Sequence, residues 1–307
     1  MAIGRLQLKP LSYDFPPWRP PSEANSLLVR VTRGCTWNRC TFCSMYKHTI
    51  FERRPLQEIK ADILTAASLY GAEVRTVFIG DSNSPSIKTA DFADILRQLY
   101  ASFPAIERVT SYARAKTLLK KSPGDLKQLR QAGLTRLHVG LETGNAGLLK
   151  KVSKGATPDE MVAGCLKAKA AGLELSLYVL LGLGGEALSA AHARDTAAVL
   201  NRIDPHFIRV RTLQPQPGSE LYDDMQSGLF TKAFHETVLR EQRIMLADLT
   251  VTSDYLSDHI TNYIPVNGKL PGDKENMLRM IDEHSADLAR NAALQSRFAR
   301  KDRLQSL

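Results

Sequence analysis

The sequence predicts an α/β fold in which a curved, mostly parallel sheet forms a partial (βα)6 barrel of the TIM type. From Ser26 onward, six short apolar or β-branched runs alternate with segments of helical period. These runs are nearly continuous in apolar residues, which is typical of parallel strands covered by helices. Glycine stands between helix and strand in "QAGLTR" and "AAGLEL", as helix-to-strand turns require. Six units are too few to close an eight-stranded barrel, and the functional residues should lie at the carboxyl ends of the strands.

The six units can be placed along the chain in order. The expected strands are 26–32, 74–80, 107–113, 135–142, 173–182 and 206–213, and the expected helices between them are 57–70, 89–101, 123–131, 158–171 and 188–202. Residues 1–25, which contain "FPPWRPP", are expected to form an extended strap, and residues 26–218 the barrel.

Residues 219–307 are expected to form a helical extension of the barrel. A helix near 232–249 precedes a loop-rich stretch, and a final helix follows with a polar tail. The loop "SDYLSDHITNY" is open to two interpretations, a turn with helix-capping acids or a lid over the barrel mouth. His259 in this loop is therefore a candidate substrate-binding residue.

Composition excludes several classes of protein. The chain has 307 residues, of which 43% are apolar, so it can bury a substantial core. Neither a signal-peptide pattern at the N-terminus nor an apolar run of about 18 residues is present, so a cytoplasmic protein is expected. The net charge of +9 fits a solvated basic surface or a small anionic substrate better than nucleic acid, because only "RFARKDR" is densely basic.

Three of the four cysteines, Cys35, Cys40 and Cys43, are spaced C-x4-C-x2-C. A zinc site would need a fourth ligand, for which only His48 is close. A plant-type ferredoxin site would need a further cysteine downstream, but Cys165 falls in an amphipathic segment and is expected to be a core residue. The motif therefore indicates three thiolate ligands and an open fourth position.

Three cysteines after the first strand of a partial barrel resemble the radical S-adenosylmethionine (SAM) superfamily. The resemblance implies a [4Fe–4S] cluster whose fourth iron binds SAM, and whose electron cleaves SAM to a 5′-deoxyadenosyl radical. The spacing is one residue longer than the usual C-x3-C-x2-C, while Phe42 keeps the usual aromatic residue before the last cysteine. The resemblance also implies a reductant such as flavodoxin or ferredoxin.

Later segments are similar to the branch that includes elongator-type, methylthiotransferase and oxygen-independent coproporphyrinogen oxidase enzymes. In "LHVGLETGNAGLLKKVSKGAT", the resemblance implies that Glu142 and Lys154 contact SAM. It further implies contacts to SAM at four other positions, of which Asp81 replaces the family's usual second glycine: Gly80, Asp81, Ser111 and Gly182.

The sequence also indicates where a substrate binds. Alternation on the sixth strand places Arg209 and Arg211 on one face, which should point into the barrel and need an anion, whether substrate, SAM or an internal carboxylate. His138 shares the inward parity of Glu142 and is either a packed polar residue or a substrate contact. A small anionic substrate is therefore expected. RNA and a non-enzymatic iron–sulfur carrier are the alternatives.

Overall fold

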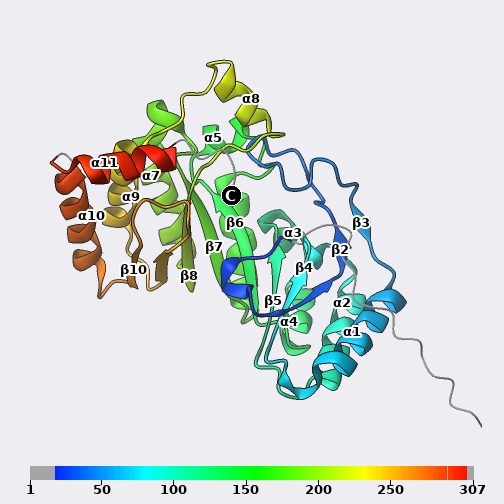
Figure 1. The fold of residues 1–307 in the computed structure, drawn as a ribbon. Helices are drawn as coiled ribbons and strands as arrows, with labels where there is room; N and C mark the ends of the chain where they lie inside the picture. Colours follow the sequence, from blue (N-terminus) through cyan, green and yellow to red (C-terminus); the bar gives the residue numbers. More distant parts are fainter. Residues whose placement is uncertain (1–17, 289, 303–307) are drawn as a thin grey trace, which may run out of the picture.

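The computed structural model describes residues 18–288 and 290–302, and it contains an eight-stranded sheet that curves through the molecule (Figure 1). Neighbours from β1 to β9 are parallel, and β10 is antiparallel to β9. In spatial order the strands are β1 (Leu27–Arg30), β4 (Thr76–Gly80), β5 (Arg108–Ala113), β6 (Arg136–Glu142), β7 (Glu174–Leu181), β8 (Phe207–Thr212), β9 (Asp254–Ser257) and β10 (Val266–Lys269). The six predicted strands and the predicted partial barrel are confirmed.

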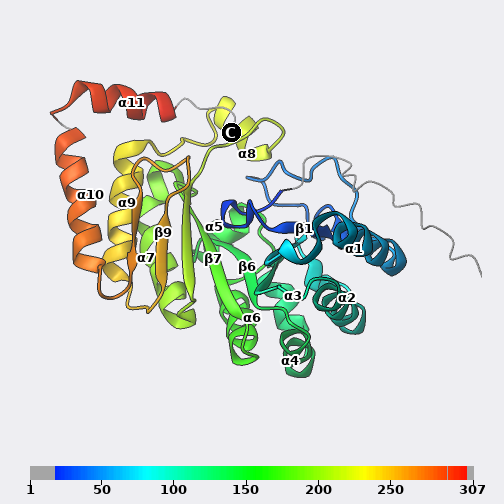
Figure 2. The same ribbon diagram turned by 60° about the horizontal axis from the view of Figure 1, so that its bottom comes forward.

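Helices cover the outer face of the sheet and form an arc around it (Figure 2). Those of the barrel are α1 (Leu56–Tyr70), α2 (Thr89–Ser102), α3 (Ala115–Lys120), α4 (Pro123–Gln131), α5 (Ala146–Lys151), α6 (Pro158–Ala170) and α7 (Gly185–Ile203). Those after β8 are α8 (Glu220–Gln226), α9 (His235–Asp248), α10 (Lys274–Leu288) and α11 (Ala292–Asp302). The short helices α3, α5 and α8 were not predicted, because six or seven residues carry little periodicity.

The two faces of the sheet differ in chemistry. The outer face packs on the helices and is apolar, with Val77, Val109, Leu137, Leu177 and Ile208 in the main core. The inner face carries large polar and aromatic side chains. Neighbouring residues of adjacent strands lie in register there: Tyr112 beside His138, Tyr178 beside Arg209, and the small residue Gly140 beside Tyr178. Strand alternation therefore gives the barrel a polar interior inside an apolar shell.

The segment before β1 closes the amino-terminal end of the barrel. Glu23, in the 3₁₀ helix Pro21–Glu23, is fully buried and accepts hydrogen bonds from Ser26 Oγ (2.6 Å) and Arg108 Nη2 (3.3 Å). His138 Nε2 lies 3.2 Å from its Oε1 atom. Burial alone would raise the pKa of Glu23, but His138 and Ser26 together lower it to about 2. Most of the predicted strap, residues 1–17, lies outside the described residues.

The stretch predicted to be loop-rich contains two strands. β9 and β10 extend the sheet beyond the six predicted strands, and Tyr255 on β9 is fully buried. The sequence hides them because each is four residues long and mostly polar, as short strands near a sheet edge often are. The expected final helix is two helices, α10 and α11.

Candidate active site at the carboxyl ends of the strands

The three clustered cysteines lie on a loop at the mouth of the barrel. The loop is closed at its base by a two-stranded pairing of β2 (Thr32–Arg33) with β3 (Glu52–Arg53), which lies outside the main sheet. All three thiols are free and half-buried. We refer to residues 34–51 as the cysteine loop.

The end of β4 anchors the start of the cysteine loop. The Asp81 carboxylate accepts a hydrogen bond from Gly34 N (2.9 Å) and forms a buried ion pair with Arg30 (2.9 Å). Ser82 Oγ donates to the Gly34 carbonyl (2.9 Å), and Asn83 Nδ2 donates to Thr36 Oγ1 (3.0 Å). The Asp81 side chain is thus engaged by protein groups and does not fit the predicted contact to SAM, whereas it does hold the loop that bears the thiols.

The loop after α5 supports the middle of the cysteine loop. Trp37 Nε1 donates to the Ser153 carbonyl (2.7 Å), and Thr41 N donates to the Val152 carbonyl (3.1 Å). A Cβ at Gly155 would lie 2.3 Å from the Trp37 ring, so only glycine allows the indole to approach this closely. Arg114 directly follows β5, and its guanidinium lies 4.9 Å from the centre of the same ring. These contacts connect the cysteine loop to the end of β5 and to the loop after α5.

The donor set at the loop fits an iron–sulfur cluster. Burial raises the pKa of Cys40 and raises that of Cys43 to about 11, and the charges of nearby Lys154 and Arg114 oppose the shift at Cys40. A bound cluster would supply the positive charge that favours the thiolate form of these cysteines. Among the described residues no group of three or more Cys, His, Asp or Glu side chains is arranged to hold a single metal ion. Cys165 is buried in the main core, as predicted.

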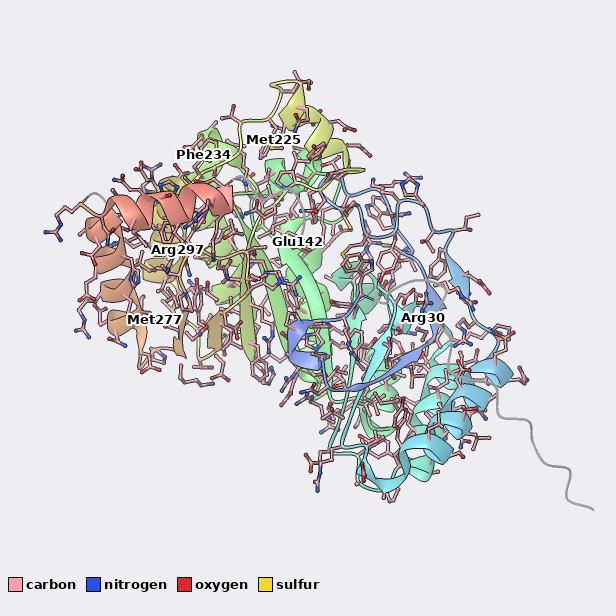
Figure 3. All side chains as sticks on the ribbon, in the orientation of Figure 1. Arg30, Glu142, Met225, Phe234, Met277 and Arg297 are labelled. Carbon is pink, nitrogen blue, oxygen red and sulfur yellow. The ribbon has the colours of Figure 1, made fainter. Side chains whose placement is uncertain are left out.

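Glu142 and Lys154 lie together beside the cysteine loop. Lys154 Nζ is 2.7 Å from Glu142 Oε1, and it also lies 5.7 Å from the centre of the Phe42 ring. Burial works against the charge of Lys154, but the Glu142 and Cys40 charges raise its pKa above the usual value. A Cβ at Gly140 would lie 2.1 Å from Glu142 Oε1, so this glycine makes room for the pair. Figure 3 labels Glu142 near the carboxyl end of β6.

Two further predicted SAM contacts, Ser111 and Gly182, form hydrogen bonds within the protein. Ser111 is fully buried on the outer face of β5, and its hydroxyl donates to the Ile79 carbonyl (2.9 Å). It does not face the mouth because strand alternation turns Tyr112 inward instead. The Gly182 N–H donates to Glu241 Oε1 (2.7 Å), so this backbone donor is already used. Gly80 remains at the carboxyl end of β4, next to the anchor of the cysteine loop.

The inner face of β7 and β8 carries the two predicted arginines. Arg209 Nε donates to Ser176 Oγ (3.2 Å), and the Arg211 guanidinium lies 4.8 Å from the centre of the Tyr178 ring. Within residues 18–288 and 290–302, neither arginine forms an ion pair with a carboxylate. Burial, and secondly the Arg211 charge, lower the pKa of His259 to about 4, so His259 is neutral beside Arg211 at pH 7.

Tyr112 lies on the inner face of β5, with its ring beside those of Phe78 and His138. Its pKa is raised by burial, while the charges of Arg211 and Glu142 also act on it in opposite directions. His138, in contrast, is fully buried among the rings of Phe78, Tyr112 and Tyr178 and faces Glu23 at the closed end. This placement favours a packed polar residue over a substrate contact.

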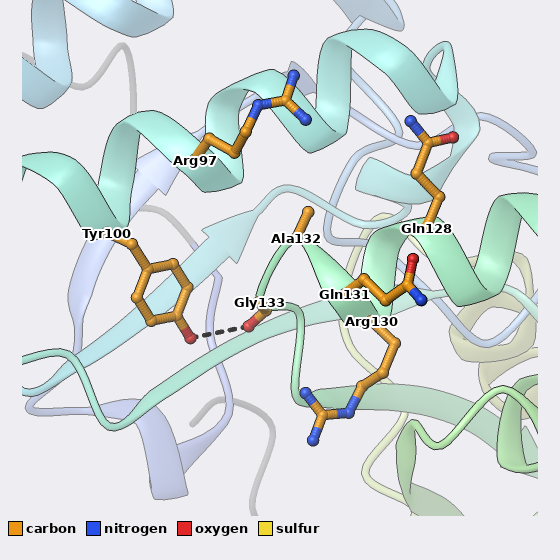
Figure 4. A pocket seen from close by; sticks show the side chains of 7 residues that line it. All are labelled: Arg97, Tyr100, Gln128, Arg130, Gln131, Ala132 and Gly133. Carbon is orange, nitrogen blue, oxygen red and sulfur yellow. Dashed lines mark hydrogen bonds between the residues drawn. The ribbon is translucent and has the colours of Figure 1, made fainter.

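A separate surface pocket of about 590 Å³ lies between α2 and α4 (Figure 4). It is lined by Arg97, Tyr100, Gln128, Arg130, Gln131, Ala132 and Gly133, and Tyr100 donates to the Gly133 carbonyl (2.9 Å). These residues belong to the carboxyl ends of their helices, which precede the next strands. The pocket therefore opens at the opposite end of the barrel from the cysteines.

The chain is similar to a known protein family and to several known proteins. The family described as the Radical SAM superfamily matches residues 29–195. A biotin synthase from Methanococcus maripaludis is 24% identical over 281 residues, covering 83% of this chain and 81% of that protein. The heme chaperone HemW from Bacillus subtilis is 25% identical over 196 residues, covering 62% of this chain and 51% of that protein.

Solved structures share the fold at low sequence identity. Methylornithine synthase (PylB) has a TM-score of 0.51 at 20% identity, with 74% of this chain and 63% of that chain covered. The radical S-adenosylmethionine methyltransferase TsrM from Kitasatospora setae has a TM-score of 0.54 at 18% identity, with 66% of this chain and 39% of that chain covered.

The family match covers more than half of the chain, so the protein belongs to the radical SAM superfamily. It is an enzyme of the class that uses a [4Fe–4S] cluster and SAM and that needs a reductant and a substrate. The resemblance seen in the sequence is confirmed. No helix within the described residues is both long and apolar enough to cross a membrane.

The Glu142–Lys154 pair leads to a prediction about SAM binding. Replacing either residue with alanine should weaken SAM binding about 10- to 100-fold, because each removes a charge-assisted hydrogen bond worth about 1.5–3 kcal/mol. Anaerobic titration of the cluster-loaded protein with SAM measures the effect. Lys60→Ala, which breaks a similar pair with Asp94 (2.6 Å) on the outer helices, is the control and should bind SAM normally. Unchanged affinity in both site variants would remove the pair from the SAM site.

Proposed function

We propose that the protein cleaves SAM reductively, with a flavodoxin or ferredoxin as electron donor, to generate a 5′-deoxyadenosyl radical that acts on a small anionic substrate inside the barrel. The bound cluster and SAM would supply the electron transfer and the radical. The residues of this chain would hold these groups, orient the substrate and keep water out.

One observation carries the proposal: the thiols and the Glu142–Lys154 pair lie together at the barrel mouth, and Arg209 and Arg211 line the inner face of β8. Cys35, Cys40 and Cys43 would hold the iron–sulfur cluster on the anchored loop. The Glu142–Lys154 pair stands 12 residues apart in sequence yet beside Cys40, where it would bind the polar end of SAM. Gly80 would present its backbone to SAM from the neighbouring strand.

The arginines support an anionic substrate. A guanidinium facing a protein interior is best satisfied by a planar anion, and no carboxylate among the described residues pairs with Arg209 or Arg211. The Tyr178 ring contacts the Arg211 guanidinium from one side. His259, neutral next to Arg211, would offer a hydrogen bond without adding charge.

The names of the relatives do not identify the substrate. Biotin synthases and heme chaperones both appear among proteins of similar identity, although their named roles differ. A carboxylate- or phosphate-bearing metabolite is the class that the two arginines favour. RNA would instead engage an exposed basic surface and bind with a steep dependence on salt.

The test uses cluster-loaded protein, dithionite and SAM under anaerobic conditions. Small-metabolite and RNA fractions of a cell extract are compared for stimulation of 5′-deoxyadenosine formation above the rate without substrate. The small-metabolite fraction should stimulate, and Arg211→Ala should raise the half-saturating amount about 10- to 100-fold while SAM cleavage without substrate continues. Arg202→Ala, which removes a guanidinium paired with Asp159 on the surface, is the matched control.

Three outcomes would contradict the proposal in different ways. Stimulation by RNA alone would refute the small anionic substrate. Equal behaviour of Arg211→Ala and Arg202→Ala would remove Arg211 from the substrate site. Loss of cleavage without substrate in Arg211→Ala would assign that arginine to SAM or to the fold.

A further inference from the structure

A buried carboxylate lies directly behind the mouth of the barrel. Glu241 on α9 is fully buried, and its two oxygens accept three hydrogen bonds. The donors are Gly182 N at 2.7 Å, Ser189 Oγ at 2.7 Å and His192 Nδ1 at 2.9 Å. The group thus connects α9 and α7 to the carboxyl end of β7.

His192 extends this network to β6. It is buried on α7, and its second ring nitrogen, Nε2, lies 3.3 Å from the Glu142 carbonyl oxygen. Both ring nitrogens therefore lie within hydrogen-bonding distance of an oxygen atom, Glu241 Oε1 on one side and the Glu142 carbonyl on the other.

Glu142 is a residue whose backbone needs support. Its φ of +64° lies in the left-handed region, which a non-glycine residue rarely adopts. The register between β6 and β7 also shifts between Gly140 and Glu142. A hydrogen bond to the Glu142 carbonyl holds the backbone in the turn that directs the Glu142 carboxylate toward Lys154.

The next residue on α9, Gln242, has different hydrogen-bond partners from Glu241. Gln242 is also buried, but its Nε2 atom donates to Tyr255 Oη (3.2 Å) and Ser257 Oγ (3.1 Å) on β9. Two consecutive buried polar residues of one helix thus bind different strands. Of these two residues, it is Glu241 that binds a strand end at the barrel mouth, directly at Gly182 and through His192 at Glu142.

We propose that Glu241 and His192 are positioning residues for SAM. Through hydrogen bonds they hold the backbone of Gly182 and of Glu142, so that the Glu142 side chain and the end of β7 keep the geometry that SAM binding requires. This inference rests on the proposed function. It adds two residues of the helix layer, on α7 and α9, that support the binding site. Groups that support a binding residue in this way typically change affinity or activity about 10- to 100-fold when removed.

The experiment compares cluster-loaded wild-type protein with Glu241→Ala, Glu241→Gln and Gln242→Ala. Iron content, the EPR signal of the reduced cluster without SAM, and the unfolding temperature are measured first, and SAM is then titrated against the EPR signal. The hydrogen bonds of Glu241 are to Gly182, Ser189 and His192 and not to the cysteine loop, so all four proteins should carry the cluster. SAM affinity should fall about 10- to 100-fold in both Glu241 variants and stay within about twofold in Gln242→Ala.

Glu241→Gln keeps the shape of the side chain, so it answers the objection that alanine merely unfolds the region. Equal SAM affinity in Glu241→Gln and Gln242→Ala, with the cluster present, would overturn the inference and leave the proposed function intact. Failure of the wild-type protein to bind SAM would instead refute the proposed function, and this inference with it.

Discussion

Replacing Cys40 with alanine should leave the purified protein without a [4Fe–4S] cluster. The three thiols lie on one anchored loop, and the resemblance to the family gives each of them one iron to bind. Removing one leaves two protein ligands, and no other cysteine of the described residues is near, since Cys165 is buried in the core behind the sheet. Iron and sulfide analysis after anaerobic reconstitution, together with the EPR spectrum of the reduced protein, measures the loss.

The control for this experiment is Cys165→Ala. It removes a thiol from the interior of α6, where burial raises the pKa to about 12, so it should lower stability slightly and leave about four irons per chain. Cys35→Ala and Cys43→Ala should behave as Cys40→Ala does. A cluster that survives any of these three substitutions, or that is lost in Cys165→Ala, would contradict the assignment of the ligands.

Asp81→Ala should destabilise the protein by about 3–5 kcal/mol, the usual cost of removing one partner of a buried ion pair. The Asp81 carboxylate is almost fully buried with Arg30, 2.9 Å away, and it also accepts the hydrogen bond of Gly34 N. The apparent unfolding temperature of the cluster-free protein should fall on the order of 10 °C. Reconstitution should also yield less cluster, because the start of the cysteine loop loses its anchor.

An ion pair at the base of the same loop provides the comparison. Glu52→Ala removes the partner of Arg33, 3.1 Å away, but Glu52 is half-exposed and its pair is solvated. Such pairs contribute roughly 0–1 kcal/mol, so the unfolding temperature should barely change. If Asp81→Ala were no more destabilising than Glu52→Ala, the buried pair would not be the anchor described above.

The barrel could be predicted from the sequence because its parallel strands are nearly continuous apolar runs that alternate with segments of helical period. Runs such as "VRTVFIG" and "LELSLYVLLG" indicate both that a strand forms and how long it is. The capping residues Ser122 and Thr157 mark the starts of α4 and α6. β9 and β10 were not predicted because these four-residue strands, one of them at the sheet edge, lack that apolar signal. Their pairing depends on tertiary contacts that no local pattern reports.

In the site, too, local sequence motifs identify some residues, while others are revealed only by tertiary packing. The thiol spacing and the pair formed by Glu142 and Lys154 could be found from local motifs, and the structure brings them together. Ser111 was matched by its motif position alone, which does not state that its side chain is buried on the outer face of β5. Glu241 and His192 lie in helices far from any motif, and only the packing of α7 and α9 reveals what they hold.

The central claim is that this chain is an enzyme that cleaves SAM, and one measurement tests it most directly. Cluster-loaded protein is reduced with dithionite in the presence of SAM, and 5′-deoxyadenosine and methionine are quantified over time against a sample of Cys40→Ala. We expect both products in equal amounts from the wild-type protein and neither from the variant. SAM that remains intact in the presence of a fully assembled, reduced cluster would contradict the account and favour an iron–sulfur carrier.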